Sequence, residues 1–279
     1  MLTMEKMENK NKKFRNPFPA VGKVFKYEMI CGARIIFPMY AILLVLSLIV
    51  GLFVMNKDLD IEPTGVVGTV KIILMVLTSI MSFVLFIITI SQIEKRYKKS
   101  ILGDEAYLNM TLPVTVGEHL WGRYLANLVW ALAYAVTGLI SVFFIFIKAL
   151  PEFGENLAKI AEAFNEYNPV YGGTFGNLIF MMALNALALF MMICVFGYMA
   201  NTLSQLVGKH KTLIEILIFA VSFILYTNLS DFLFRIESDA GHTNVTQTLM
   251  FAVLLYNIAW SAVFSVITRV ILNKNLNLE

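Results

Sequence analysis

The sequence predicts an all-α membrane protein with six transmembrane helices, and three observations lead to this fold class. Hydrophobic residues make up 58% of the 279 residues and charged residues only 15%, against roughly 25% charged in soluble domains. The mean hydropathy is +0.74. Six apolar runs approach or exceed the ~20 residues that a helix needs to cross ~30 Å of hydrocarbon. These predicted spans are about residues 35–54, 70–92, 124–147, 177–199, 212–229 and 246–269.

Helices are the expected spanning element, because a membrane-spanning backbone must satisfy its own hydrogen bonds. The period-2 alternation of a membrane β-barrel is absent. Outside the spans, residues 152–167 place apolar side chains at helical spacing among acidic ones, so we expect a short amphipathic helix there as a cap over spans 3 and 4.

The segment before the first span divides into two parts. Residues 1–20 are polar and rich in Lys and Asn, with too little apolar surface to fold, and we expect a disordered basic cytoplasmic tail. Residues 21–36 mix apolar side chains with Lys23, Lys26 and Glu28, a pattern typical of a helix lying in the membrane interface. Gly32 would supply the bend into the membrane. The alternative is a simple cytoplasmic extension of the first span.

Lys and Arg concentrate on one side of the predicted spans. Of the 22 basic residues, 17 lie before span 1, between spans 2 and 3, between spans 4 and 5, or after span 6. The opposite side holds five basic residues and ten acidic ones. Cytoplasmic loops retain Lys and Arg, so we predict that both termini are cytoplasmic. The net charge of +3 is the sum of two opposed faces, and it indicates contact with membrane lipid, not with nucleic acid.

The sequence predicts neither catalysis nor cofactor binding by this chain. His119, His210 and His242 fall in three separate loops, and the metalloprotease, Gly-x-Ser-x-Gly and phosphate-loop motifs are missing. Cys31 and Cys194 lie at the inner edge of span 1 and within span 4, which disfavours a structural disulfide. If ATP powers the protein, a second polypeptide must therefore bind it.

Self-powered ion-coupled transport is also disfavoured. Such carriers usually place ionisable residues or broken helices near the membrane midplane, and the middle of each predicted span is free of charge. Glu215 lies about one turn into span 5, where Lys211 at position i−4 would neutralise it.

The loop between spans 2 and 3 contains the segment Asp-Glu-Ala-Tyr-Leu-Asn-Met-Thr-Leu-Pro-Val at residues 104–114. Asp104 and Glu105 suit the start of a helix, where exposed amides favour negative charge, and Pro113 ends it. The sequence thus predicts one short helix with Tyr107 and Leu108 as apolar side chains. Such a helix packs either on lipid headgroups or on a soluble protein partner.

This loop, followed by Leu-Trp-Gly-Arg-Tyr-Leu at residues 120–125, resembles the first intracellular loop of bacterial ABC-2-type permeases, the membrane subunits of type V-like ABC exporters. Phe-Lys-Tyr-Glu at residues 25–28 is similar to the interfacial elbow segment of that family. The six spans with both ends inside fit the same topology over residues 21–279. Residues 115–118 depart from the family, which often has a basic residue there.

The resemblance implies a coupling helix that fits a groove on a separate cytoplasmic ABC ATPase subunit, which would bind ATP and Mg. The implied ATPase-coupling residues are Gly103, Asp104, Glu105, Tyr107, Leu108 and Met110, with Leu206 and Lys209 in a smaller second contact. Spans 2 and 5 would line the substrate path, with Phe83, Phe86, Phe219, Phe223 and Tyr226 near substrate.

By the same resemblance, the chain would pair with a second permease subunit, identical or paralogous, in the bacterial plasma membrane. Small permeases of this group in Gram-positive bacteria export amphipathic peptides, including peptide toxins, bacteriocins and antimicrobial peptides. The alternative from another class is a membrane scaffold or immunity protein that binds a toxin or a sensor kinase without transporting anything.

Overall fold

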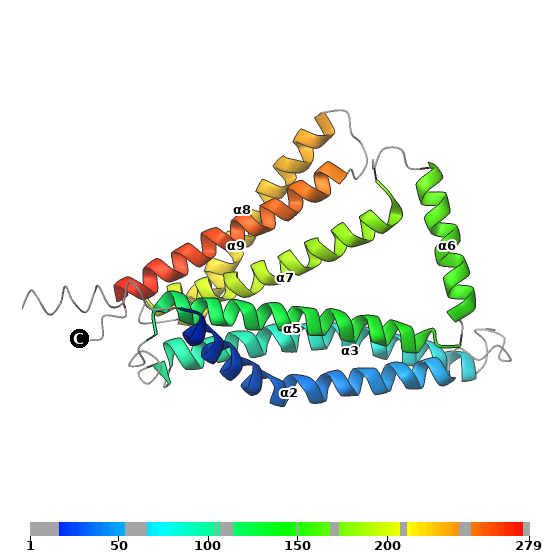
Figure 1. The fold of residues 1–279 in the computed structure, drawn as a ribbon, viewed down its shortest axis with the longest axis horizontal. Coiled ribbons are helices and arrows are strands. Elements are labelled where there is room, and N and C mark those ends of the chain that lie inside the picture. The colour runs from blue at the N-terminus through cyan, green and yellow to red at the C-terminus, as the bar shows by residue number, and fades with distance from the viewer. Residues whose placement is uncertain are drawn as a thin grey trace, which may run out of the picture.

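The computed structural model describes residues 17–53, 66–103, 105–106, 114–148, 150–167, 173–206, 211–239 and 247–275, whose regular secondary structure is entirely helical (Figure 1). The all-α fold class is confirmed over these residues. The elements are α2 (Phe18–Phe53), α3 (Val66–Tyr97), the short π-helix η1 (Lys98–Leu102), α5 (Val116–Ile145), α6 (Leu150–Tyr167), α7 (Phe175–Gln205), α8 (Lys211–Asp239) and α9 (Gln247–Asn275).

Six of these helices are long and apolar enough to cross a membrane, and each overlaps one predicted span. They are α2, α3 with η1, α5, α7, α8 and α9. The remaining helix, α6, confirms the short amphipathic helix predicted over residues 152–167. Large apolar side chains are exposed along all six long helices, as a hydrocarbon solvent requires. The chain thus has the architecture of a multi-pass membrane protein.

The first helix differs from the prediction of a separate interfacial helix. α2 is continuous from Phe18 to Phe53, so a distinct elbow helix is not shown, and the described residues fit the alternative of an extended first span. There is no break at Gly32, which is buried against the indole of Trp130; an added Cβ would lie 3.0 Å from that ring. Figure 1 shows a bend along α2, and Pro38 inside the helix provides the physical cause.

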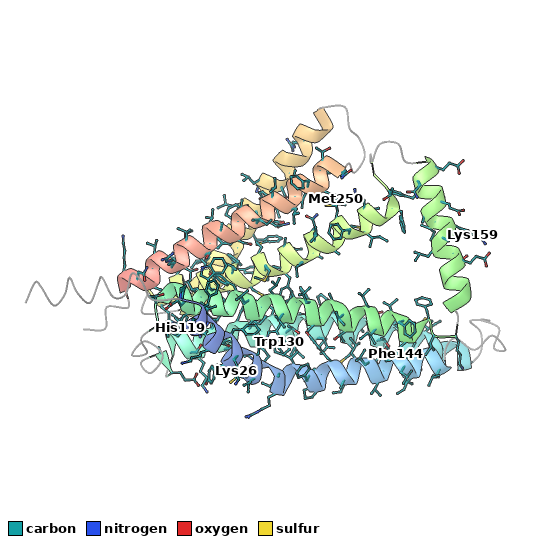
Figure 2. All side chains as sticks on the ribbon, in the orientation of Figure 1. Lys26, His119, Trp130, Phe144, Lys159 and Met250 are labelled. Atoms are coloured by element: carbon teal, nitrogen blue, oxygen red, sulfur yellow. The ribbon has the colours of Figure 1, made fainter. Side chains whose placement is uncertain are left out.

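The long helices pack most tightly at one end of the molecule. Figure 1 shows α7, α8 and α9 diverging from α2, α3 and α5 toward the side where α6 lies. Consistent with this, the buried residues of α7 all lie between Phe190 and Ser204, in its second half. We call the tightly packed end, where α2 and α5 begin and where η1, α7 and α9 end, the basic end. Figure 2 shows Lys26 and His119 at this end and Phe144 at the opposite one.

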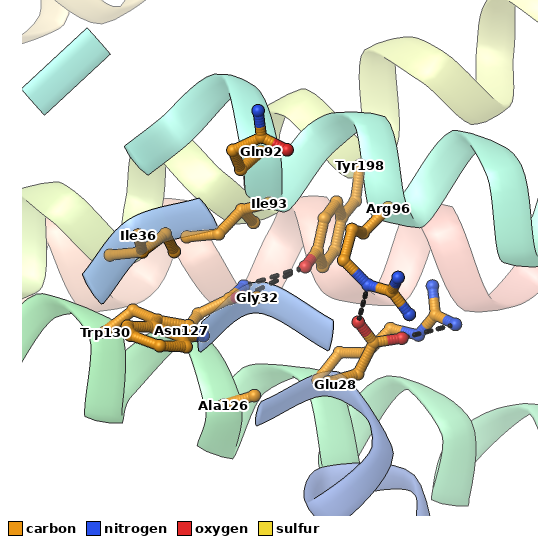
Figure 3. Close-up of a pocket in the computed structure, with 11 residues that line it drawn as sticks. Glu28, Gly32, Ile36, Gln92, Ile93, Arg96, Ala126, Asn127, Trp130 and Tyr198 are labelled. Carbon is orange, nitrogen blue, oxygen red and sulfur yellow. Dashed lines mark hydrogen bonds and ion pairs between the residues drawn. The ribbon is translucent and has the colours of Figure 1, made fainter. Parts of the chain in front are cut away.

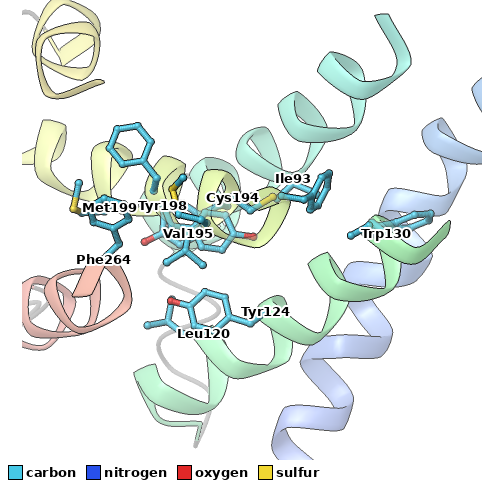
Figure 4. Packing of buried hydrophobic residues seen from close by; sticks show 14 of the residues in the cluster. Ile93, Leu120, Tyr124, Trp130, Cys194, Val195, Tyr198, Met199 and Phe264 are labelled. Atoms are coloured by element: carbon cyan, nitrogen blue, oxygen red, sulfur yellow. The ribbon is translucent and has the colours of Figure 1, made fainter. Parts of the chain in front are cut away.

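The core of the basic end is centred on α7. Cys194, Val195 and Tyr198 of α7 are buried between Tyr124 of α5 and Phe264 of α9 (Figure 4). The Phe196 ring lies 5.2 Å from the Phe264 ring of α9 and 5.2 Å from the Phe219 ring of α8, which extends this packing toward α8. Aromatic pairs at such distances add to the stabilisation from buried area, so α7 holds α5, α8 and α9 together, while α2 packs on α5 and α3.

Candidate functional site

The basic end holds a cluster of charged side chains drawn from three long helices, which we call the arginine–glutamate cluster: Glu28 of α2, Arg96 of α3 and Arg123 of α5. Arg96 Nε donates a hydrogen bond of 2.9 Å to Glu28 Oε2, and Arg123 Nη2 lies 3.1 Å from Glu28 Oε1 in an ion pair (Figure 3). The Arg123 side chain is only 4% exposed. Two guanidinium groups thus share one carboxylate, which leaves a net positive charge.

Aromatic rings and a hydroxyl complete the surroundings of the two arginines. Arg123 Nη2 donates a 2.6 Å hydrogen bond to Ser100 Oγ of η1, and its guanidinium lies 5.6 Å from the Tyr97 ring centroid. Arg96 lies 5.3 Å from the ring of Tyr27. A cavity of about 20 Å³, room for about one water molecule, borders the cluster. The cluster therefore binds helices together and is too closed for a larger ligand.

A layer of tyrosines joins the cluster to α7 and α9. The rings of Tyr97 and Tyr198 stack with centroids 4.1 Å apart, and the Tyr97 and Thr202 hydroxyls share a 2.6 Å hydrogen bond. Asn127 Nδ2 donates to the Tyr198 hydroxyl at 3.0 Å. The Tyr124 hydroxyl donates to Ser265 Oγ of α9 at 3.0 Å. These buried polar contacts satisfy one another, as polar groups in an apolar interior must.

Glu215 has a partner that we had not predicted. Its carboxylate accepts hydrogen bonds of 2.8 and 3.0 Å from Lys98 Nζ, whereas the sequence had suggested Lys211, whose side chain lies outside the described part of the chain. The reason is that α3 continues as η1 beyond the predicted end of span 2 and carries Lys98 to α8. Nearby, the Glu94 carboxylate lies directly on Gly197 of α7, in the space that a Cβ would fill.

The predicted coupling loop is described only in part. Asp104, Tyr107, Leu108, Met110 and Lys209 lie outside the described residues. Gly103 and Glu105 form a turn that folds back on η1: the Glu105 N–H donates to the Lys99 carbonyl at 3.3 Å, and the Ala106 N–H donates to the Gly103 carbonyl at 2.9 Å. Glu105 also pairs with Lys99 at 3.0 Å. Leu206 is exposed at the end of α7.

After the loop, residues 115–118 have a structural use. Thr115 caps α5: the Glu118 N–H donates to Thr115 Oγ1 at 3.3 Å, and the Thr115 N–H donates to Glu118 Oε2 at 2.7 Å. This reciprocal pair is a capping box. It starts α5 at Val116, eight residues before the predicted span, and explains these residues without an ATPase contact.

The five predicted substrate-path residues do not share one surface. Phe219, Phe223 and Tyr226 line a cavity of about 410 Å³ between α7, α8 and α9. Phe86 instead packs in the core, 6.0 Å from the Phe190 ring, and Phe83 is 65% exposed. Within the described structure, residues of α7 and α9, not of α3, form the other walls of the cavity.

The described residues do not gather the side chains that a metal site needs. No group of three or more His, Cys, Asp and Glu side chains that could hold a metal ion occurs there, and Cys31 and Cys194 are free thiols. Comparisons of the chain with protein-family models, with curated proteins and with solved structures find no match. The function must therefore be argued from the residues themselves.

Proposed function

We propose that this chain is the membrane subunit of an ATP-driven exporter of the ABC-2 type, located in a bacterial plasma membrane with its basic end toward the cytoplasm. The six membrane-length helices support this topology, as does the bias of 17 of 22 basic residues toward one side. The resemblance of residues 104–114 to a coupling loop supports the assignment of a soluble partner.

The observation that carries the proposal is the anchoring of the segment just before that loop. Tyr97 bonds to Thr202 of α7, Lys98 to Glu215 of α8, and Ser100 to Arg123 of α5. A loop that receives force from a soluble partner can act on the spans only through a rigid connection. Three polar contacts within four residues provide such a connection to three helices, and Arg123 extends it to Glu28 of α2.

The chain itself contributes neither an ATP site nor a catalytic group in this proposal. ATP and Mg would be bound by the cytoplasmic ATPase subunit, and a second permease subunit, identical or paralogous, would complete the pathway. The cavity beside Phe219, Phe223 and Tyr226 is apolar and aromatic, which suits the apolar face of an amphipathic peptide. Amphipathic peptides are thus the proposed cargo class.

Co-purification tests this proposal. The full-length chain, extracted from its native membrane in mild detergent, should bring down an ABC ATPase in about stoichiometric amount, detected by mass spectrometry and by ATP hydrolysis in the eluate. The double variant Tyr107→Asp/Leu108→Asp should lose it, because a buried apolar contact tolerates charge poorly. The matched control, Leu157→Asp/Ile160→Asp, places the same charges on exposed apolar side chains of α6 and should retain the ATPase.

Two outcomes would contradict the proposal. A wild-type protein that purifies without any ATPase would favour the scaffold or immunity class. If the double variant is monodisperse and still binds its full complement of ATPase, residues 107 and 108 contact lipid and not the ATPase subunit.

A further inference from the structure

A second large groove, of about 430 Å³, lies between α5, α7 and α9 at the basic end. The buried side chains of Leu120, Tyr124 and Val195 form its floor, and the exposed side chains of Trp121 and Val266 form part of its rim. The groove is therefore open to the surroundings along the side of the helices. It does not involve the predicted coupling loop or the predicted substrate-path residues.

The length of the groove matches one leaflet of a bilayer. Along α9 its lining runs from Ile258 through Ala262 to Arg269. With a helical rise of 1.5 Å per residue, these eleven steps span about 16 Å. That is about half of the ~30 Å hydrocarbon thickness of a membrane, so the groove extends from one interface to near the midplane.

The end of the groove at the interface is cationic. Arg269 is exposed and, within the described part of the chain, makes no ion pair. Its guanidinium lies beside Gly117 near the start of α5, where an added Cβ would be 3.7 Å from Arg269 Cζ. The neighbouring carboxylate of Glu118 is engaged in the cap with Thr115. Trp121, 62% exposed on the next turn of α5, is of the type that marks a membrane interface.

Among the described residues that line the groove, the interior polar groups are the hydroxyls of two serines and Tyr124, and each already takes part in one hydrogen bond. Ser261 Oγ donates to the Asn257 carbonyl at 2.9 Å, and Ser265 Oγ accepts the Tyr124 hydroxyl at 3.0 Å. An extended peptide in the groove would leave most of its own N–H and C=O groups unbonded, at a cost of several kcal/mol per group in hydrocarbon. A hydrocarbon chain has no such groups to satisfy.

We infer that this groove binds an anionic phospholipid, with the phosphate at Arg269 and one acyl chain along Leu120, Val195 and Ile258. The planar guanidinium of an arginine suits a phosphate, which it contacts with two parallel N–H groups. The apolar floor and the one-leaflet length suit the chain. The site is independent of the proposed export function, since neither the loop nor an ATPase takes part.

Native mass spectrometry of the purified full-length chain tests this inference, with phosphatidylglycerol and phosphatidylcholine of identical acyl chains as probes. Phosphatidylglycerol should bind the more tightly. Arg269→Gln should weaken its affinity about tenfold or more, as expected for the loss of a charge-assisted hydrogen bond. The control Lys274→Gln removes an exposed charge about one turn further along α9 and should change nothing.

A second pair of variants tests the acyl chain. Ala262→Phe should fill the groove and reduce binding of both lipids, whereas Val263→Phe places the same new side chain on an exposed neighbour outside the groove and should leave both unchanged. Equal affinity for the two lipids in the wild type, or full phosphatidylglycerol binding by Arg269→Gln, would overturn the inference. So would displacement of the lipid by an equal concentration of amphipathic peptide, which would assign the groove to cargo.

Discussion

Glu28→Gln is the substitution that best tests the arginine–glutamate cluster. It keeps the size of the side chain and its ability to accept a hydrogen bond, but it removes the negative charge that Arg96 and Arg123 share. The two arginines differ in their exposure to solvent. Arg96 is 21% exposed and lies at the edge of the cluster, whereas Arg123 is buried, with Nε and Nη1 lacking a hydrogen-bond partner among the described residues.

The expected loss of stability in Glu28→Gln follows from this difference in exposure. Breaking a buried ion pair by removing one partner costs about 3–5 kcal/mol, because the remaining charge is left uncompensated. Arg123 keeps its bond to Ser100 and the ring of Tyr97, so we expect the lower end, about 3 kcal/mol. At about 2–4 °C per kcal/mol for a chain of this size, the midpoint of thermal unfolding should fall by about 6–12 °C.

The assay is thermal unfolding of the detergent-purified chain, followed by the fluorescence of its tryptophans, of which Trp130 lines the cavity beside the cluster. The control, Glu105→Gln, removes the partner of Lys99, which is 65% exposed, and should change stability by at most about 1 kcal/mol. Glu28→Gln/Arg123→Met should recover part of the loss, since it removes the stranded charge. A Glu28→Gln midpoint equal to that of wild type would refute this account of the cluster.

Two further predictions concern helix packing and topology. Gly51→Ala should destabilise the protein by about 3 kcal/mol, the upper end for overpacking, because the added Cβ would overlap the backbone of Phe144; Gly138→Ala, in open space, should stay within about 1 kcal/mol. Thermal midpoints of the two variants decide this prediction. In a cysteine-free background, Gly154→Cys should react with an impermeant thiol reagent in intact cells and Lys99→Cys should not, because both are exposed but at opposite ends of the bundle. Labelling of Lys99→Cys in intact cells would contradict the proposed orientation, in which the basic end faces the cytoplasm.

The long helices could be predicted from the sequence because each is determined locally. A run of about 20 apolar residues must be helical in a bilayer whatever it packs against, so each of the six predicted spans overlaps one long helix. The starts were less accurate, since α2 begins 17 residues and α5 eight residues before the predicted span. The start of α5 also had a local signal: Thr115 and Glu118 have the spacing of a capping box. No local signal predicted that α3 would continue as η1, because Lys98 and Lys99 are typical of a loop leaving the membrane.

The arginine–glutamate cluster could not be predicted, because its members are 68 and 95 residues from Glu28. In the sequence these residues are topology signals at three span ends, and only packing brings them together. A weak signal was present in Glu28, an acidic residue among the basic residues just before the first span. The division of the aromatic residues between Phe86 in the core and Phe219 at a cavity likewise depends on helix rotation, which apolar runs leave undetermined.

The chemistry of the contacts at the basic end bears on how force would pass through it. Apolar side chains hold helices together over broad surfaces but tolerate repacking at modest cost. A buried polar network has one favourable geometry, because each displaced partner is left unsatisfied. Tyr97 and Ser100 contact α7 and α5 through such bonds, and the partly exposed Lys98 adds an ion pair with Glu215 of α8, whereas the opposite end diverges in Figure 1. A displacement of η1 would therefore move α5, α7 and α8 together at the basic end, while the apolar contacts farther along the helices adjust.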